Sequence, residues 1–172
     1  MKKMKRLVAV LLAGIMALAV LTACGGTPSA PVTRDEALEK SVAEWTVELG
    51  KGAKLELTQD ATLTSISDKC LPAFTKAYDA RLASDKTAFA DAMNKAQNTF
   101  KAATNGKKVA PVDVFIPNTM DFTKENVINV VQNNMGNIQN ILNKAGVKNP
   151  AKFGVTVTKQ DEYTLILFMV SE

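Results

Sequence analysis

The stretch Tyr163-Thr164-Leu165-Ile166-Leu167-Phe168-Met169-Val170 decides the fold, because it is apolar at almost every position. Side chains alternate between the two faces of a strand, and both alternating sets here are apolar apart from Thr164. A strand of this kind is stable when both of its faces are covered. The stretch therefore predicts a central strand in a small sheet with helices on both faces.

Two segments before it also have strand patterns. Val109 to Ile116 is apolar and β-branched, and Pro111 predicts that the start of this strand lies at an edge or outside the ladder, because proline cannot donate to a neighbouring strand. Residues 153–157 alternate large apolar side chains with Gly or Thr, which predicts a half-buried strand. Gln160-Asp161 then predicts the turn into the final strand.

The residues before Val109 predict four helices, each with apolar residues at steps of three or four. We expect their boundaries at capping or breaking residues: Thr33 and Gly52 for the first, Thr58 for the second, Pro72 for the third, and Ser84-Asp85 and Asn105-Gly106 for the fourth. Cys70 shares a face of the second helix with Leu63 and Ile66. It is therefore interpreted as a small core residue and not as a nucleophile.

A fifth helix is expected between the first two strands. Thr123 can cap it, its apolar stripe runs from Val127 to Leu142, Gly146 ends it, and Gly136 can interrupt it. This helix and the one that carries Trp45 have the clearest apolar stripes, so we expect both to cover the sheet. The predicted fold class is α+β, a three-layer α-β-α sandwich with a small, largely antiparallel sheet.

The start of the chain has the parts of a secretory signal. Lys2, Lys3, Lys5 and Arg6 precede an apolar run from Leu7 to Leu21, which is shorter than the roughly 20 residues that span a bilayer. We therefore expect a signal peptide, a flexible tether and a single globular domain. Their predicted ranges are 1–23, 24–33 and 34–172.

The stretch Leu21-Thr22-Ala23-Cys24 resembles the lipobox of bacterial lipoproteins. The resemblance implies cleavage between Ala23 and Cys24 and attachment of lipid to the Cys24 thiol. The protein would then be anchored to the cell membrane on its extracytoplasmic face, where two or three acyl chains hold it stably. An ordinary signal peptide with a chance cysteine is the alternative.

Composition argues against several kinds of site. The chain has no histidine, which is the commonest general base and metal ligand. With Cys24 lipidated, Cys70 is the one remaining thiol, so we expect no metal and no other cofactor. Four of the 21 basic residues lie in the signal, which leaves as many basic as acidic residues after it. They are scattered, so we expect no nucleic-acid partner.

Three stretches resemble the CAP superfamily of cysteine-rich secretory, antigen 5 and pathogenesis-related-1 proteins. They are Asn134-Met135-Gly136-Asn137-Ile138-Gln139-Asn140-Ile141-Leu142, then Phe153-Gly154-Val155-Thr156-Val157 with the final strand, and Leu55-Glu56-Leu57-Thr58-Gln59-Asp60-Ala61-Thr62-Leu63. The resemblance implies that the Trp45 helix and the Val127 helix cover opposite faces of the sheet. It also implies a domain that binds lipid, peptide or protein. The family's metal site would be lost, because Asn137 stands in the place of one of its histidines. Residues 72–104 have no counterpart.

The leading hypothesis is an anchored, non-enzymatic binding domain whose ligand is a lipid, a peptide or an envelope protein. Amide side chains gather in the fifth helix and are a candidate groove, although an ordinary solvated helix face has the same composition. These candidate groove residues are Gln132, Asn133, Asn134, Asn137 and Asn140.

Two alternatives remain open at this point. A carboxylate-dependent hydrolase would use Asp113, Asp121 and Glu125, which are close in sequence but which we place among exposed turn residues. A working acid among them needs a perturbed pKa. The other alternative is a structural envelope lipoprotein of an unrelated α+β fold, which the order of the strands would reveal.

Overall fold

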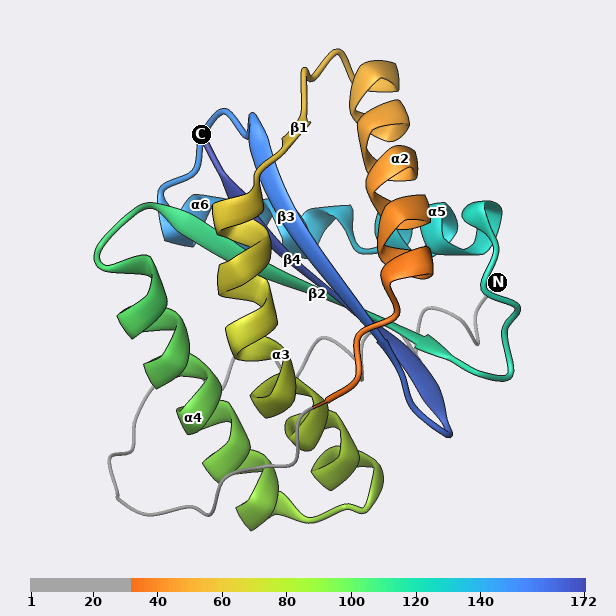
Figure 1. The fold of residues 1–172 in the computed structure, drawn as a ribbon, viewed down its shortest axis with the longest axis vertical. Coiled ribbons are helices and arrows are strands. Elements are labelled where there is room, and N and C mark those ends of the chain that lie inside the picture. Colours follow the sequence, from red (N-terminus) through yellow and green to blue (C-terminus); the bar gives the residue numbers. More distant parts are fainter. Residues whose placement is uncertain (1–31) are drawn as a thin grey trace.

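The computed structural model describes residues 32–172, so the predicted signal peptide, Cys24 and residues 24–31 of the tether lie outside the described residues. The sheet has four strands in the order β1-β3-β4-β2 (Figure 1). Their bounds are Thr58–Gln59 for β1, Val109–Pro117 for β2, Lys152–Lys159 for β3 and Tyr163–Ser171 for β4. β4 is antiparallel to both of its neighbours, and β1 is parallel to β3. The final strand is thus central, as predicted.

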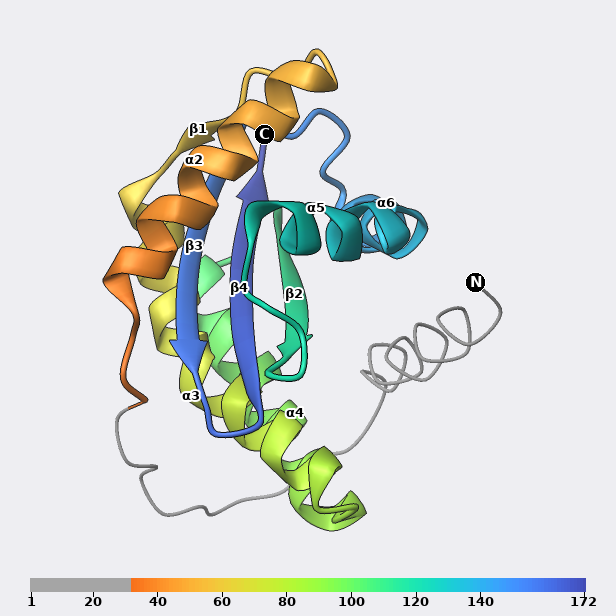
Figure 2. The ribbon, with the colours of Figure 1, turned by 90° about the vertical axis from the view of Figure 1, so that its right-hand side faces the viewer.

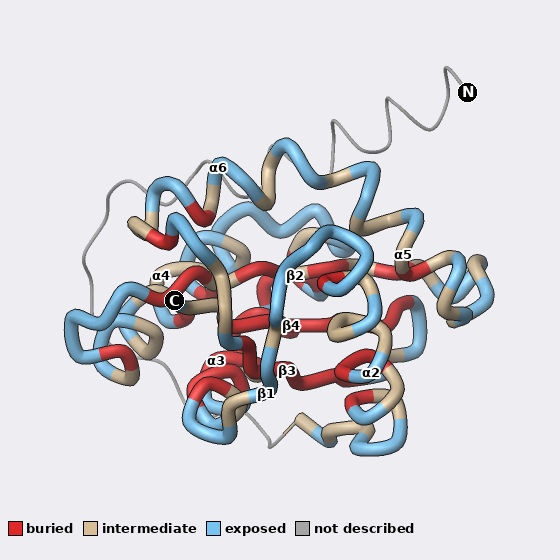
Figure 3. Tube along the Cα trace, turned by 90° about the horizontal axis from the view of Figure 1, so that it is seen from above, coloured by how far each residue is buried: buried red, intermediate tan, exposed pale blue. Residues whose placement is uncertain are grey.

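Helices cover both faces of the sheet, which confirms the α-β-α sandwich (Figures 1 and 2). α3 (Ala61–Leu82) and α4 (Lys86–Thr104) lie on one face. α2 (Glu36–Gly52), α5 (Lys124–Asn133) and α6 (Met135–Ala145) lie on the other. Seen from above, the buried strands lie between helices with exposed outer surfaces (Figure 3). β2, which contains Pro111, is an edge strand as predicted.

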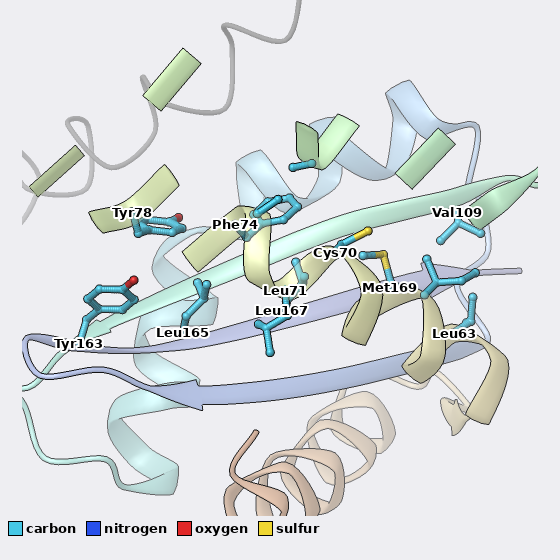
Figure 4. Packing of buried hydrophobic residues seen from close by; sticks show 13 residues of the cluster. Leu63, Cys70, Leu71, Phe74, Tyr78, Val109, Tyr163, Leu165, Leu167 and Met169 are labelled. Atoms are coloured by element: carbon cyan, nitrogen blue, oxygen red, sulfur yellow. The ribbon is translucent and has the colours of Figure 1, made fainter. Parts of the chain in front are cut away.

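One alternating set of β4 side chains forms the core under α3 and α4. Leu165, Leu167 and Met169 have no exposed surface there, and Cys70 of α3 packs in the same cluster (Figure 4). Burying a large apolar side chain stabilises a fold by about 1.5–3 kcal/mol. The prediction that Cys70 is a core residue is confirmed.

The other alternating set of β4 faces α2, α5 and α6. Ile166 and Phe168 share one core cluster with Trp45 of α2 and Val127 of α5. The expectation that the helices of Trp45 and Val127 cover opposite faces is therefore wrong. The physical reason is that α3 and α4 together cover the first face, which leaves the other helices to share the second. The resemblance to the CAP superfamily implied opposite faces, and the structure contradicts this part of it.

Several helix boundaries differ from the predicted ones. Asp35 and Asp60, not Thr33 and Thr58, cap α2 and α3, because each aspartate accepts a hydrogen bond from a backbone N–H three residues ahead at 3.0 Å. Asp85 caps α4 as predicted. All three caps satisfy N–H groups that a helix start otherwise leaves without partners.

α3 continues through Pro72, where a new helix was expected. A proline in a helix interior removes one hydrogen bond and costs about 3 kcal/mol. Residues on both sides of it are buried against the sheet, among them Leu71 and Phe74, and this burial offsets the cost. The predicted break in the fifth helix is real, but it falls at Asn134 and not at Gly136.

β3 is buried on both faces, not on one as predicted. Gly154 is the reason on the α3 side, because a Cβ atom built there would lie 2.0 Å from the backbone nitrogen of Thr64. The absence of a side chain lets the start of α3 lie directly on the strand.

The N-terminal end of the described chain is fixed to the part of β3 that extends beyond its short pairing with β1. The Glu39 carboxylate is buried, accepts a hydrogen bond from the Val157 N–H at 3.0 Å, and pairs with Arg34 at 2.5 Å. The Thr33 carbonyl accepts from the Thr158 hydroxyl at 2.8 Å. The last residues of the predicted tether are therefore part of the domain.

Candidate apolar binding site

A cavity of about 340 Å³ lies over the sheet between α2 and α5–α6. It forms because α2 packs on β3 while α6 packs on β2, so that neither helix covers the central strand completely. Phe168 and Val170 of β4 line its floor, together with Val112 and Val114 of β2 and Phe153 of β3.

The wall of this cavity is apolar. Apart from the indole of Trp45, only Thr46 and Gln132 contribute polar side chains, and the Thr46 hydroxyl already donates to the Val42 carbonyl at 2.7 Å. Among the described residues, no ionisable side chain lines the cavity. The lining residues are Val42, Trp45, Thr46, Leu49, Gly50, Ala53, Leu55, Leu57, Val112, Val114, Val127, Ile128, Val131, Gln132, Met135, Ile138, Leu142, Pro150, Phe153, Phe168 and Val170.

Two contacts join α2 to the segment at the start of α5, beside the cavity. The rings of Trp45 and Phe122 lie with their centroids 6.0 Å apart. The Glu48 carboxylate and the Lys124 ammonium form an exposed ion pair at 2.5 Å. Exposed ion pairs contribute little to stability, so the aromatic contact is the stronger of the two links.

The cavity is partly open to solvent, and two of the apolar side chains that line it are exposed at this open end. Leu55 is 38% exposed and Met135 is 50% exposed. Among the described residues the only other large apolar side chain that is exposed is Leu82, on the far side of the sheet. Apolar residues that gather in the open are typical of a binding surface.

A basic turn borders this open end. α2 ends where the Leu55 N–H donates to the Gly50 carbonyl at 2.8 Å, and this closing turn places Lys54 in the left-handed conformation with φ 61°. That conformation costs a non-glycine residue about 1–2 kcal/mol. Lys51 and Lys54 are both exposed, and they stand directly next to lining residues in the sequence.

Of the five predicted amide residues, only Gln132 lines the cavity. The Asn134 side chain donates to a backbone carbonyl of α5 at 2.7 Å, which ties it to the break between the two helices. Asn133 and Asn140 are exposed, Asn137 is half-buried, and none of these three lines the cavity. The amides therefore do not form the wall of the cavity.

The three carboxylates of the hydrolase alternative do not line the cavity either. Asp121 and Glu125 are exposed. Asp113 was expected in an exposed turn, and this is wrong, because β2 runs through it and its carboxylate accepts a hydrogen bond from the hydroxyl of Tyr78 on α3. Burial raises the pKa of Asp113 above its usual value.

Asp113 belongs to a polar and aromatic cluster beneath α3. The rings of Tyr78 and Tyr163 stack on Phe115 at 5.2 Å and 5.0 Å, and the Tyr163 hydroxyl donates to Asp79 at 2.7 Å. Burial raises the pKa of both tyrosines. The cluster satisfies its own polar groups within the core, which is the behaviour of a structural network.

No group of three or more Cys, Asp or Glu side chains in residues 32–172 is arranged to hold a metal ion. Cys70 is fully buried, and burial raises the pKa of its thiol to about 11. A thiol in that state is a poor nucleophile and a poor ligand, since both roles need the thiolate.

Sequence reasoning missed the mouth of the cavity. Leu55 and Leu57 lie between the first two predicted helices, and Met135 lies among the amide residues, so neither position was predicted to line a site. A signal was nevertheless present: Val127, Val131 and Met135 follow one another at steps of four, and the same stripe continues into α6.

No family model matches the chain, and neither the curated proteins nor the solved structures compared with it include a significant match. Within residues 32–172, no helix is both long enough and apolar enough to cross a membrane.

Proposed function

We propose that this chain is a lipid-anchored binding protein on the extracytoplasmic face of the cell membrane, and that it holds an apolar ligand between α2 and α5–α6 without acting as an enzyme. The observation that carries the proposal is the apolar cavity of about 340 Å³. Small-molecule sites in proteins typically occupy about 300–1,000 Å³ and have mostly apolar walls. The anchoring part rests on the stretch Leu21-Thr22-Ala23-Cys24.

The wall determines which ligands fit. A charged group in this cavity would lose its water and find no counter-charge, which is strongly unfavourable. An apolar group gains about 25 cal/mol for each Å² removed from water, so a ligand that buries about 200 Å² gains roughly 5 kcal/mol before ordering costs. Such a ligand would also cover Leu55 and Met135, which face water in the open cavity.

The proposal is tested with the uncharged fluorescent probe N-phenyl-1-naphthylamine and the fragment 25–172. This fragment contains all strands of the sheet and both of its helical layers. Val131→Trp places a large side chain in the cavity and should weaken probe binding about tenfold or more, since about 1.4 kcal/mol corresponds to each factor of ten.

The matched control is Ala102→Trp, at an exposed position of α4 on the other face, which should bind the probe as the unchanged domain does. Urea unfolding of both variants shows whether they are folded. Equal binding by folded Val131→Trp and the unchanged domain would contradict the proposed site, and so would the absence of any binding by the unchanged domain.

A further inference from the structure

The cavity wall favours a hydrocarbon chain over a peptide. Every peptide residue has polar backbone groups, and burying one without a partner costs about 1–3 kcal/mol. The wall offers few partners, since the Thr46 hydroxyl is bonded to Val42 and Gln132 is exposed at the mouth. A hydrocarbon chain has no polar groups, so the same wall buries it without this penalty.

The volume corresponds to one acyl chain of medium length. A water molecule occupies about 30 Å³ of liquid, and a methylene group is of similar size. The cavity of about 340 Å³ therefore accommodates roughly eleven methylene groups. An unbranched chain can adjust its shape to the space between the two helices and the sheet by rotation about its single bonds.

The charges at the mouth favour an anionic headgroup. Lys51 and Lys54 stand at the α2 side of the opening, where their acidic neighbours in the sequence are Glu48 and Glu56, and Glu48 is paired with Lys124. Neither lysine forms an ion pair with another described residue. On the other side of the opening, residues 130–140 contain no charged side chain. The opening is therefore apolar inside and positive at one edge.

We infer that the cavity takes one unbranched acyl chain of an anionic amphiphile, whose headgroup stays outside beside Lys51 and Lys54. This inference rests on the apolar-ligand binding proposed above and adds the class of the ligand. Free fatty acids and single-chain phospholipids share this chemistry, because each joins one acyl chain to an anionic head.

The first experiment measures chain length by displacement of N-phenyl-1-naphthylamine from the fragment 25–172. Fatty acids of about 8 to about 16 carbons are compared. Affinity should rise about fourfold with each added methylene group until the cavity is filled, near a chain of about twelve carbons, and then level off. Probe binding without any displacement by acyl chains would overturn this inference and leave the proposed function intact. The absence of probe binding would overturn both.

The second experiment tests the headgroup with laurate, dodecanol and lauroyl-lysophosphatidylglycerol, which have the same chain length. The double variant Lys51→Glu/Lys54→Glu should weaken laurate binding about fivefold or more and leave dodecanol binding unchanged. The matched control Lys76→Glu/Lys95→Glu changes two exposed lysines on α3 and α4, and it should bind all three as the unchanged domain does. Equal loss for dodecanol and laurate, or no loss for laurate, would overturn the headgroup assignment.

Laurate and the lysophospholipid distinguish the two possible sources of the acyl chain, a free fatty acid and a single-chain phospholipid. Binding of both laurate and the lysophospholipid supports an anionic head of either kind, whereas binding of laurate alone supports a free fatty acid. A third variant, Met135→Asp, should weaken all three ligands because it replaces an apolar contact at the exposed mouth with a carboxylate, and it should weaken the two anionic ligands more than dodecanol. Its control is Leu82→Asp, at the exposed apolar residue on the far face. Equal effects of these two variants would overturn the location.

Discussion

At the residue scale, Asp113 is the least expected feature of the core. Its carboxylate lies on β2 under α3 and accepts a hydrogen bond from the Tyr78 hydroxyl. A single hydrogen bond to a charged group contributes about 1.5–3 kcal/mol, which does not outweigh the cost of removing a carboxylate from water. Burial therefore raises the pKa of Asp113, so the folded domain holds this proton more tightly than the unfolded chain does.

This pKa predicts a pH-dependent difference between the domain and its Asp113→Asn variant. As pH rises, the unfolded chain releases the Asp113 proton first, near a pKa of about 3.9, while the folded domain still retains it. Raising the pH thus lowers the free energy of unfolding of the unchanged domain through the titration of Asp113. The asparagine variant does not show this decrease, because asparagine does not titrate. Relative to the unchanged domain, Asp113→Asn should gain about 1.4 kcal/mol for each unit by which the folded pKa exceeds the unfolded one.

The measurement is urea unfolding of both proteins at about pH 4 and at about pH 8, where other titrating groups cancel in the difference. The quantity compared is the free energy of unfolding of Asp113→Asn minus that of the unchanged domain. If this difference does not increase between the lower and the higher pH, Asp113 does not carry a raised pKa.

Cys70 should react with a thiol reagent far more slowly in the folded fragment 25–172 than in denaturant. It has no exposed surface, and burial raises its pKa to about 11, which alone lowers the thiolate fraction roughly a hundredfold compared with a free thiol. The rate is followed by absorbance with a disulfide reagent. Similar rates in both states would place Cys70 at the surface. Its helical spacing with Leu63 and Ile66 was sufficient to predict this burial from sequence, because all three face the same way.

At the scale of elements, local sequence patterns predicted which helices and strands are present better than they predicted where these elements pack. β4 could be identified as central from its two apolar faces, and β2 as an edge strand from Pro111. The double burial of β3 could not be predicted, because it depends on contacts far away in the sequence: Gly154 against α3 and Glu39 against the Val157 N–H. Tertiary packing likewise carries α3 through Pro72, against the local preference for a new helix start.

Gly154 and Gly136 should respond in opposite directions to replacement by alanine. A Cβ at Gly154 would lie 2.0–2.1 Å from backbone atoms of α3, so α3 must move off β3, and we expect a loss of about 3 kcal/mol or more in the free energy of unfolding. A Cβ at Gly136 in α6 meets nothing within 4 Å, and Gly136→Ala should stabilise the domain by about 0.5–1 kcal/mol through helix propensity. Chemical unfolding of both variants is the test, and a neutral Gly154→Ala would show that α3 does not lie directly on the strand.

At the scale of the whole molecule, the two apolar faces of β4 predict three layers. They do not predict which helices lie in which outer layer. An apolar stripe shows that a helix covers something and leaves open which face it covers. Trp45 and Val127 therefore could not be assigned to one side in advance. The cavity is even harder to predict from the sequence. It forms because α2 and α5–α6 diverge above one strand, and no local sequence pattern encodes this divergence.

Anchoring and apolar binding would support each other if both hold. α2 has 17 residues and is about 25 Å long. Leu55, which is exposed at the open end of the cavity, follows the C-terminal end of α2. Lipid attachment at Cys24, as proposed, would keep the domain close to a membrane and thus to a supply of acyl chains.

The last prediction tests the anchor itself. Cys24→Ala should abolish incorporation of labelled palmitate into the full-length chain, because lipid attachment needs the thiol, and the chain should persist as a precursor about 2 kDa heavier than the processed form. The control is Cys70→Ala, which removes the other cysteine of the sequence. Since Cys70 is buried in the folded domain, its replacement should leave labelling and processing unchanged. The fold of Cys24→Ala should also be unaffected, because every strand and covering helix described here lies after residue 31. Labelling that survives in Cys24→Ala and disappears in Cys70→Ala would reject the lipobox, while the apolar cavity would remain a property of the domain alone.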